Sequence, residues 1–208
     1  MTVTAAVMAP AIMYALDTTI ANVALPHMQG SLSATHDQIA WVLTSYIVAS
    51  AIMTAPTAWL SARFGRRNYF IFAVIGFTVA SGLCGAAQSL EQIVAFRILQ
   101  GIFGASLIPI SQAILLDTYP PAKHGSAMAI WGVGVMIGPI LGPTLGGYLT
   151  EYYGWRYVFY INLPMGVLSV FTILLSVEEH PDNRRFPFDG LGFALLSIAV
   201  GSFQLMLD

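Results

Sequence analysis

The chain has 208 residues with a formal net charge of −2 at pH 7, and 57% of its residues are hydrophobic while only 9% are charged. An average soluble domain carries about 25% charged residues, so this composition excludes an ordinary soluble protein and makes lipid the solvent for most of the chain. The balance of charge gives no indication of nucleic-acid binding. The single cysteine, Cys84, excludes a disulfide within the chain.

Six segments are long and apolar enough to cross a bilayer, which takes about 20 mostly apolar residues. In chain order they are 5–25, 39–60, 69–87, 90–116, 127–149 and 158–177, and the run at 191–207 begins a seventh. Helices are the expected form, because an open backbone cannot cross lipid and the alternation typical of barrel strands is not seen. Thr35 and Gln38 fit a capping box before the second helix.

The pattern therefore predicts an all-α membrane protein with three parts. A six-helix amino-terminal transmembrane domain covers 1–177, a cytoplasmic loop covers 178–189, and 190–208 starts a seventh helix. Cytoplasmic loops carry an excess of lysine and arginine. The loops after the second, fourth and sixth spans share one side and hold Arg63, Arg66, Arg67, Lys123, Arg184 and Arg185, whereas the opposite side has only Arg156. We therefore expect a cytoplasmic amino terminus.

Asp17 lies inside the first apolar segment, about 18 Å from the cytoplasmic end of the helix at a rise of about 1.5 Å per residue. A carboxylate at that depth costs about 2.5–3.5 kcal/mol on insertion scales, and such groups commonly face a bundle interior or a wet cavity and relay protons. Two alternatives stay open. Asp17 only hydrogen-bonds a neighbouring helix, or the span is offset and Asp17 lies near an interface.

Arg97 lies inside the fourth segment at a similar level, about 20 Å from the cytoplasmic face of a core about 30 Å thick. Pairing with Asp17 would lower the cost of both charges, so we predict that the two side chains meet. A proton-handling pair and a static pair that only fixes packing are both compatible with this depth.

The fifth segment carries glycines at every fourth position: Gly134, Gly138, Gly142 and Gly146. Small residues at this spacing allow another helix to approach closely in lipid. Pro139 and Pro143 are expected to bend the helix beside this glycine stripe. The stripe predicts tight packing, and a role in movement is the further hypothesis.

Seven short motifs occur in order along the chain. They are 16–26 and 41–46 in the first two spans, 59–67 in the following loop, 97–104, 134–147, 155–164 and 189–192. Together they resemble the major facilitator superfamily and, within it, the fourteen-helix drug:proton antiporters of the EmrB/QacA type. In that family 59–67 corresponds to motif A, 97–104 to motif B and 134–147 to motif C. The resemblance implies a six-helix amino-terminal bundle of the major facilitator fold plus the start of a seventh, linker helix.

By this resemblance the function is proton-coupled multidrug efflux by alternating access, driven by a proton gradient and using no cofactor. Asp17 and Arg97 are the proton-coupling candidates. The expected partners are the lipid bilayer, protons, and amphipathic or apolar small molecules, in a multi-pass protein of the bacterial inner membrane. The candidates for the substrate cavity are apolar or neutral: Met13, Asn22, Trp41, Tyr46 and Gln100.

Motif A contributes Arg63, Gly65, Arg66 and Arg67 as conformational residues, but it departs from the family pattern. Ala58 and Ala62 stand where the family has a glycine and an aspartate, so the carboxylate that normally braces this loop is absent. Asp117, at the cytoplasmic end of the fourth span, could still pair with Arg66.

The chain has about half the length that a fourteen-helix member needs, so a carboxyl-terminal half is the expected missing partner. Two alternatives remain: another metabolite or sugar carrier of the same superfamily, or a truncated half that only packs with a partner. An enzyme is disfavoured because no nucleophile, phosphate or zinc motif occurs. The four histidines, His27, His36, His124 and His180, lie in loops without metal-ligand spacing. A channel is disfavoured because no filter segment repeats.

Overall fold

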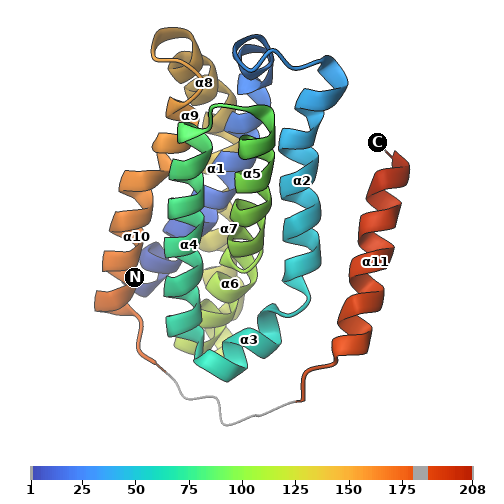
Figure 1. Cartoon of the computed structure of the whole chain (residues 1–208). Helices are drawn as coiled ribbons and strands as arrows, with labels where there is room; N and C mark the ends of the chain where they lie inside the picture. The colour runs from blue at the N-terminus through green and yellow to red at the C-terminus, as the bar shows by residue number, and fades with distance from the viewer. Residues whose placement is uncertain (1, 180–186, 208) are drawn as a thin grey trace.

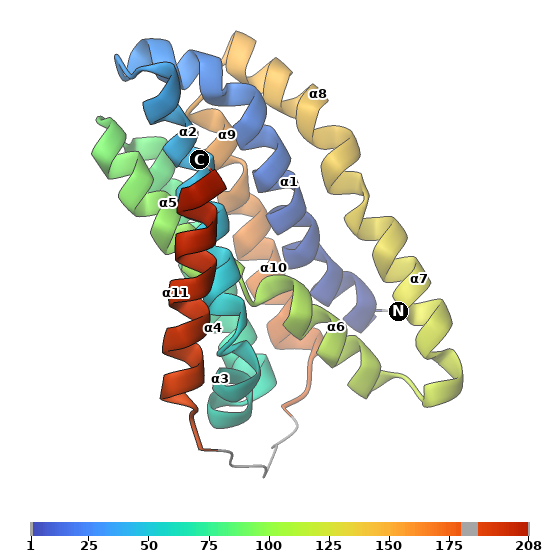
Figure 2. The same cartoon turned by 90° about the vertical axis from the view of Figure 1, so that its right-hand side faces the viewer.

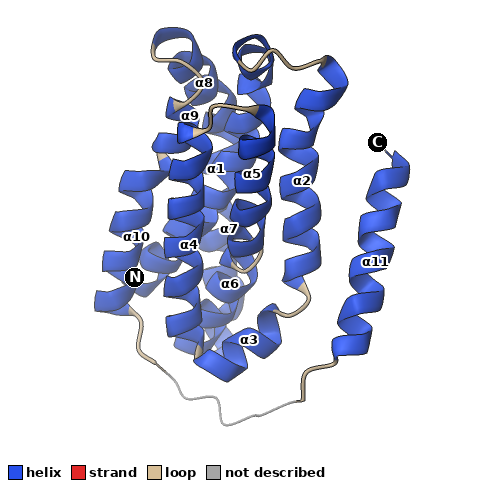
Figure 3. Cartoon of the chain, viewed as in Figure 1, coloured by secondary structure: helices blue, strands red, loops and turns tan. Residues whose placement is uncertain are grey.

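The structure, a computed structural model, describes residues 2–179 and 187–207, and these form helices and loops without a strand (Figure 1, Figure 3). The first helices are α1 (Thr2–Ser31), α2 (His36–Thr54), α3 (Thr57–Phe64), α4 (Arg66–Ala86), α5 (Leu90–Gly104) and α6 (Leu107–Thr118). A 3₁₀ turn, Pro121–Lys123, leads to α7 (His124–Val135), α8 (Ile137–Tyr152), α9 (Tyr157–Tyr160), α10 (Asn162–Ser176) and α11 (Gly190–Leu207). The all-helical prediction is confirmed.

The described residues hold five helical stretches of spanning length, and a sixth if the bent pair of α2 and α3 counts as one span. Five helical stretches are long and apolar enough to span: Thr2–Ser31, Arg66–Ala86, Leu90–Thr118, Pro121–Tyr152 and Tyr157–Ser176. The sixth is the pair α2 and α3, which is bent by 59°. The sequence pattern gave this span as one helix over 39–60, and that is wrong. Pro56 lies at the bend, where it has no N–H to donate and restricts the residue before it.

Prolines also explain why three spans are divided into two helices. Pro109, Pro139 and Pro164 cannot donate to the carbonyl four residues earlier, so the helices interrupted there are α5–α6, α7–α8 and α9–α10. Beside the glycine stripe the helix is interrupted at Met136, between α7 and α8, whereas Pro143 lies inside α8 without interrupting it. The capping box before α2 is confirmed, because Gln38 N–H donates to Thr35 Oγ1 and Thr35 N–H donates to Gln38 Oε1.

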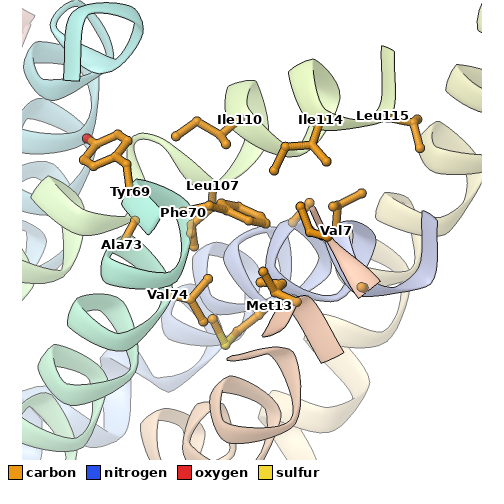
Figure 4. Close-up of a cluster of buried hydrophobic side chains, with 14 of the residues drawn as sticks. Val7, Met13, Tyr69, Phe70, Ala73, Val74, Leu107, Ile110, Ile114 and Leu115 are labelled. Carbon is orange, nitrogen blue, oxygen red and sulfur yellow. The ribbon is translucent and has the colours of Figure 1, made fainter. Parts of the chain in front are cut away.

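Helix α1 is the central element of the bundle (Figure 2). It packs against α8 on one side and against α6 and α10 on others, while α5 lies between α2 and α4. Helix α11 stands at the edge, beside α2. The half of the core near α3 joins α1, α4 and α6 through side chains such as Val7, Phe70 and Leu107 (Figure 4). A second apolar cluster around Ile20, Val42 and Phe159 fills the other half.

The described basic residues outside the buried network lie at the two ends of the bundle. Arg66, at the start of α4, pairs with Asp117 at the end of α6, so the α3–α4 loop and the α6–α7 connection share one end. Arg156 lies at the other end, where its Nη2 donates to the carbonyl oxygen of Ala87 at 3.0 Å. The arginines at 184 and 185, and most of the predicted loop over 178–189, lie outside the described residues.

Candidate functional site

A buried ion pair joins α1 to α5. Arg97 Nη1 lies 2.6 Å from Asp17 Oδ2, and the two side chains are 0% and 1% exposed. The pairing predicted from their depths is therefore confirmed. Neither charge reaches the outer surface of the bundle, so each depends on protein groups in place of water.

Three further contacts hold Arg97 in place. Its Nε donates to the backbone carbonyl oxygen of Val42 on α2 at 3.0 Å, and its Nη1 donates to Gln100 Oε1 at 2.9 Å. Its guanidinium carbon lies 3.9 Å from the centre of the Tyr46 ring, which adds a cation–π contact. The arginine is thus fixed from α1, α2 and its own helix.

The second oxygen of Asp17 receives two amide donors. Gln100 Nε2 donates to Asp17 Oδ1 at 2.9 Å, and Asn162 Nδ2, from the start of α10, donates to the same oxygen at 2.8 Å. Asn162 Nδ2 also lies 2.9 Å from Ser81 Oγ on α4, and Ser81 donates to the carbonyl oxygen of Phe159. The network around Asp17 therefore reaches six helices: α1, α2, α4, α5, α9 and α10.

Asn162 and Ser81 were not among the site residues expected from the sequence. Asn162 did stand in a motif, and it is a polar residue in a strongly apolar span, which was the available signal. Ser81 gave none, because a single serine is ordinary in a membrane helix. Asp17 is the acceptor in all three of its side-chain hydrogen bonds, because a charged carboxylate has no hydrogen to donate.

The five cavity candidates do not lie together in this chain. Gln100 and Tyr46 belong to the buried network, and Met13 is fully buried in the apolar core beside Val74 (Figure 4). Trp41 is 42% exposed, and Asn22 is also on the outer surface of the bundle. Trp41 borders a cavity of about 580 Å³ between α1 and α2, which also includes Pro26 and Thr44.

The glycine stripe faces α1. A Cβ atom at Gly138 would lie 2.8 Å from Ala15 Cβ and 2.9 Å from the backbone nitrogen of Leu16, and one at Gly146 would lie 3.3 Å from Ile20 Cα. Gly134 and Gly142 likewise leave room for side chains of α1. The predicted tight packing is confirmed, and the partner of the stripe is the helix that carries Asp17.

The motif A residues connect the α3–α4 loop to two other helices at the α3 end of the bundle. Gly65 takes a φ of +85° between α3 and α4, a conformation that favours glycine. Arg66 forms the predicted ion pair with Asp117, and Arg67 Nη2 donates to the carbonyl oxygen of Leu174 on α10 at 2.8 Å. Arg63 is exposed on α3. The loop is thus fastened to both α6 and α10.

Among the described residues, no group of three or more histidine, cysteine, aspartate or glutamate side chains lies close enough together to hold a metal ion.

Comparison with known proteins gives a consistent result. The family model described as Major Facilitator Superfamily matches residues 8–206. The multidrug export protein EmrB of Escherichia coli K12 is 44% identical over 94% of the chain, and the fatty acid resistance protein FarB of Neisseria gonorrhoeae is 41% identical over 94%. The chain spans only 38% and 39% of these two relatives. The partially occluded, inward-open xylose transporter XylE from E. coli superposes with a TM-score of 0.77 at 17% identity, covering 100% of this chain and 59% of that one.

Proposed function

Since this chain belongs to the major facilitator superfamily, we propose that it is the amino-terminal half of a proton-coupled multidrug efflux transporter that works by alternating access. The observation that carries this proposal is the buried Asp17–Arg97 pair, whose oxygens and nitrogens connect four helices, α1, α2, α5 and α10. The similarity to proteins named for multidrug export supports the substrate class. A membrane transporter family also argues against the enzyme alternative.

In this proposal Asp17 binds and releases the coupling proton. Protonation removes the negative charge of the pair and leaves the Arg97 charge uncompensated in a site without exposed surface, which is unfavourable. The network must then rearrange, and every partner of Asp17 lies on a helix other than α1. A proton thus changes how α1 is held by α5 and α10.

The glycine stripe gives that change a direction. Leu16, next to Asp17, lies against Gly138, and Thr19 Oγ1 donates to the Gly138 carbonyl oxygen at 3.4 Å. Helix α1 is therefore held by polar contacts on one side and by a smooth glycine surface on the other. In the proposed mechanism α1 shifts along this surface when the charge on Asp17 changes, and the two halves of the complete transporter rock around a midplane site.

We also propose that the protein lies in the bacterial inner membrane with its amino terminus in the cytoplasm. The support is the excess of arginine and lysine at the α3 end. Partners would be the lipid bilayer, protons, amphipathic or apolar molecules, and a carboxyl-terminal half.

Two alternatives are testable beside this one. The fold shared with a xylose transporter is compatible with export or uptake of a metabolite, and a half that only packs with a partner would transport nothing. Competition by sugars, against competition by amphipathic cations and fatty acids, separates the first alternative from drug efflux.

The experiment joins the chain to the remaining segment of E. coli EmrB and measures dye efflux in everted vesicles with an imposed pH gradient. We expect gradient-driven efflux by the unsubstituted fusion and none by Asp17→Asn. Asp37→Asn, at an exposed carboxylate in the first turn of α2, is the matched control and should transport normally. Undiminished efflux by Asp17→Asn at equal expression would refute proton coupling through this residue.

A further inference from the structure

Neutralising Asp17 creates a specific hydrogen-bonding problem in the network. The carboxylate receives three donors, from Arg97, Gln100 and Asn162. A protonated carboxyl group is itself a donor and needs an acceptor. Each of the three atoms that now faces it carries hydrogen, so one partner must exchange a donor for an acceptor.

Gln100 cannot make that exchange without a loss. Its Oε1 already accepts from Arg97 Nη1 at 2.9 Å and from Cys84 Sγ at 3.5 Å. Turning its amide would place Nε2 against the arginine nitrogen, so that two donors would face each other. Arg97 has no acceptor to offer.

Asn162 can make the exchange. Its Oδ1 is buried and has no hydrogen-bond partner among the described residues, whereas its Nδ2 holds both Asp17 Oδ1 and Ser81 Oγ. An amide rotation of about 180° exchanges the two nearly isosteric atoms and moves Nδ2 into the buried place of Oδ1; unlike the turn of Gln100, it brings no two donors against each other, and its cost is the two hydrogen bonds that Nδ2 now makes. Oδ1 would then accept from protonated Asp17, and the Ser81 hydroxyl could turn from the Phe159 carbonyl to donate to the same oxygen.

We propose that the side chain of Asn162 responds to the protonation state of Asp17. It donates a hydrogen bond to the carboxylate, and after its amide turns it accepts one from the protonated carboxyl group. This inference rests on the proposed proton coupling. Asn162 is the first residue of α10, just after the break at Ile161, so its amide rotation links the proton on α1 to the start of α10. Asn162 is a positioning residue in this scheme, since its amide is not titratable and neither takes up nor releases the coupling proton.

The charged and titratable neighbours are few. Around Asp17, α5 contributes Arg97, α2 contributes Tyr46 and α4 contributes Cys84. Helix α10 contributes only the neutral Asn162. A change in the Asn162 amide can therefore be assigned to Asp17 by removing that one carboxyl group.

The test is nuclear magnetic resonance of the 208-residue chain in lipid nanodiscs, labelled at asparagine side-chain amides and aspartate carboxyl carbons. The Asn162 signal is assigned by its loss in Asn162→Ser. We expect it to shift between two positions with the same midpoint as the Asp17 carboxyl signal. Asn22, exposed on α1, should not shift. In Asp17→Asn the Asn162 signal should stay near its low-pH position at every pH.

An Asn162 signal that stays fixed while the Asp17 carboxyl titrates would overturn the inference, and so would a shift that persists in Asp17→Asn. A carboxyl group that never titrates while the chain is folded would also overturn it. Failure of the proposed function shows separately, as normal gradient-driven efflux by Asp17→Asn in the EmrB fusion. The resonance experiment and the efflux experiment therefore distinguish failure of the Asn162 inference from failure of the proposed function.

Discussion

The stability coupling between Asp17 and Arg97 can be worked out from their surroundings. Asp17→Asn leaves the fully buried arginine without its counter-charge, and breaking a buried pair in this way costs about 3–5 kcal/mol. Arg97→Gln leaves a carboxylate that still has the amide donors of Gln100 and Asn162, so we expect the lower end of the same range, about 3 kcal/mol. The double variant carries no uncompensated charge.

The loss of stability in the double variant should therefore be smaller than the sum of the two single losses by about 1–3 kcal/mol. The assay is unfolding of the purified chain by a denaturing detergent in mixed micelles, followed by tryptophan fluorescence, for the four members of the cycle. Additive effects, within about 0.5 kcal/mol, would mean that the two side chains do not stabilise each other in the folded protein.

The remaining predictions concern the glycine stripe, the Arg66–Asp117 ion pair of motif A and the 208-residue chain without a carboxyl-terminal half. Gly138→Leu should abolish efflux by the EmrB fusion and Gly138→Ala should reduce it less, whereas Gly147→Leu, with open space around it, should be tolerated; equal dye efflux by all three would contradict the packing on α1. Asp117→Asn should lower stability by less than about 1 kcal/mol, because its ion pair with Arg66 is partly exposed, yet it should slow transport, and restoration by exchanging the two charges would identify the pair as the cause. The 208-residue chain alone should insert and fold but give no more dye efflux than empty-vector cells, and gradient-dependent efflux by it would instead indicate a homodimer of halves.

The apolar spans and the buried ion pair were readable from the sequence, because both depend on position along the chain, whereas the division of spans into shorter helices was not. Apolar length gives the spans, and counting residues from each end places Asp17 and Arg97 at one depth. The glycine stripe was readable for the same reason, since its period of four residues defines one face of a helix.

What the sequence did not provide is how each helix is rotated about its axis and which helices are neighbours. Asn22 and Trp41 were grouped with Gln100 as cavity candidates, and the rotation of α1 and α2 places these two on the surface of the bundle while Asp17 and Tyr46 are buried; their place in a substrate cavity stays a prediction. Asn162 reaches Asp17 only because α10 packs against α1, a contact between segments 145 positions apart. The bend at Pro56 was missed because the span was drawn through the proline as far as residue 60.

Proton coupling through Asp17 is tested most directly by proton release on drug binding. The purified fusion of this chain with the remaining segment of EmrB is placed in weakly buffered detergent solution with a pH-sensitive dye, and a transported drug is added. If Asp17 holds the coupling proton, the unsubstituted protein releases protons in proportion to the drug bound, and Asp17→Asn binds the drug without releasing them. Equal proton release by Asp17→Asn would show that Asp17 does not hold the coupling proton.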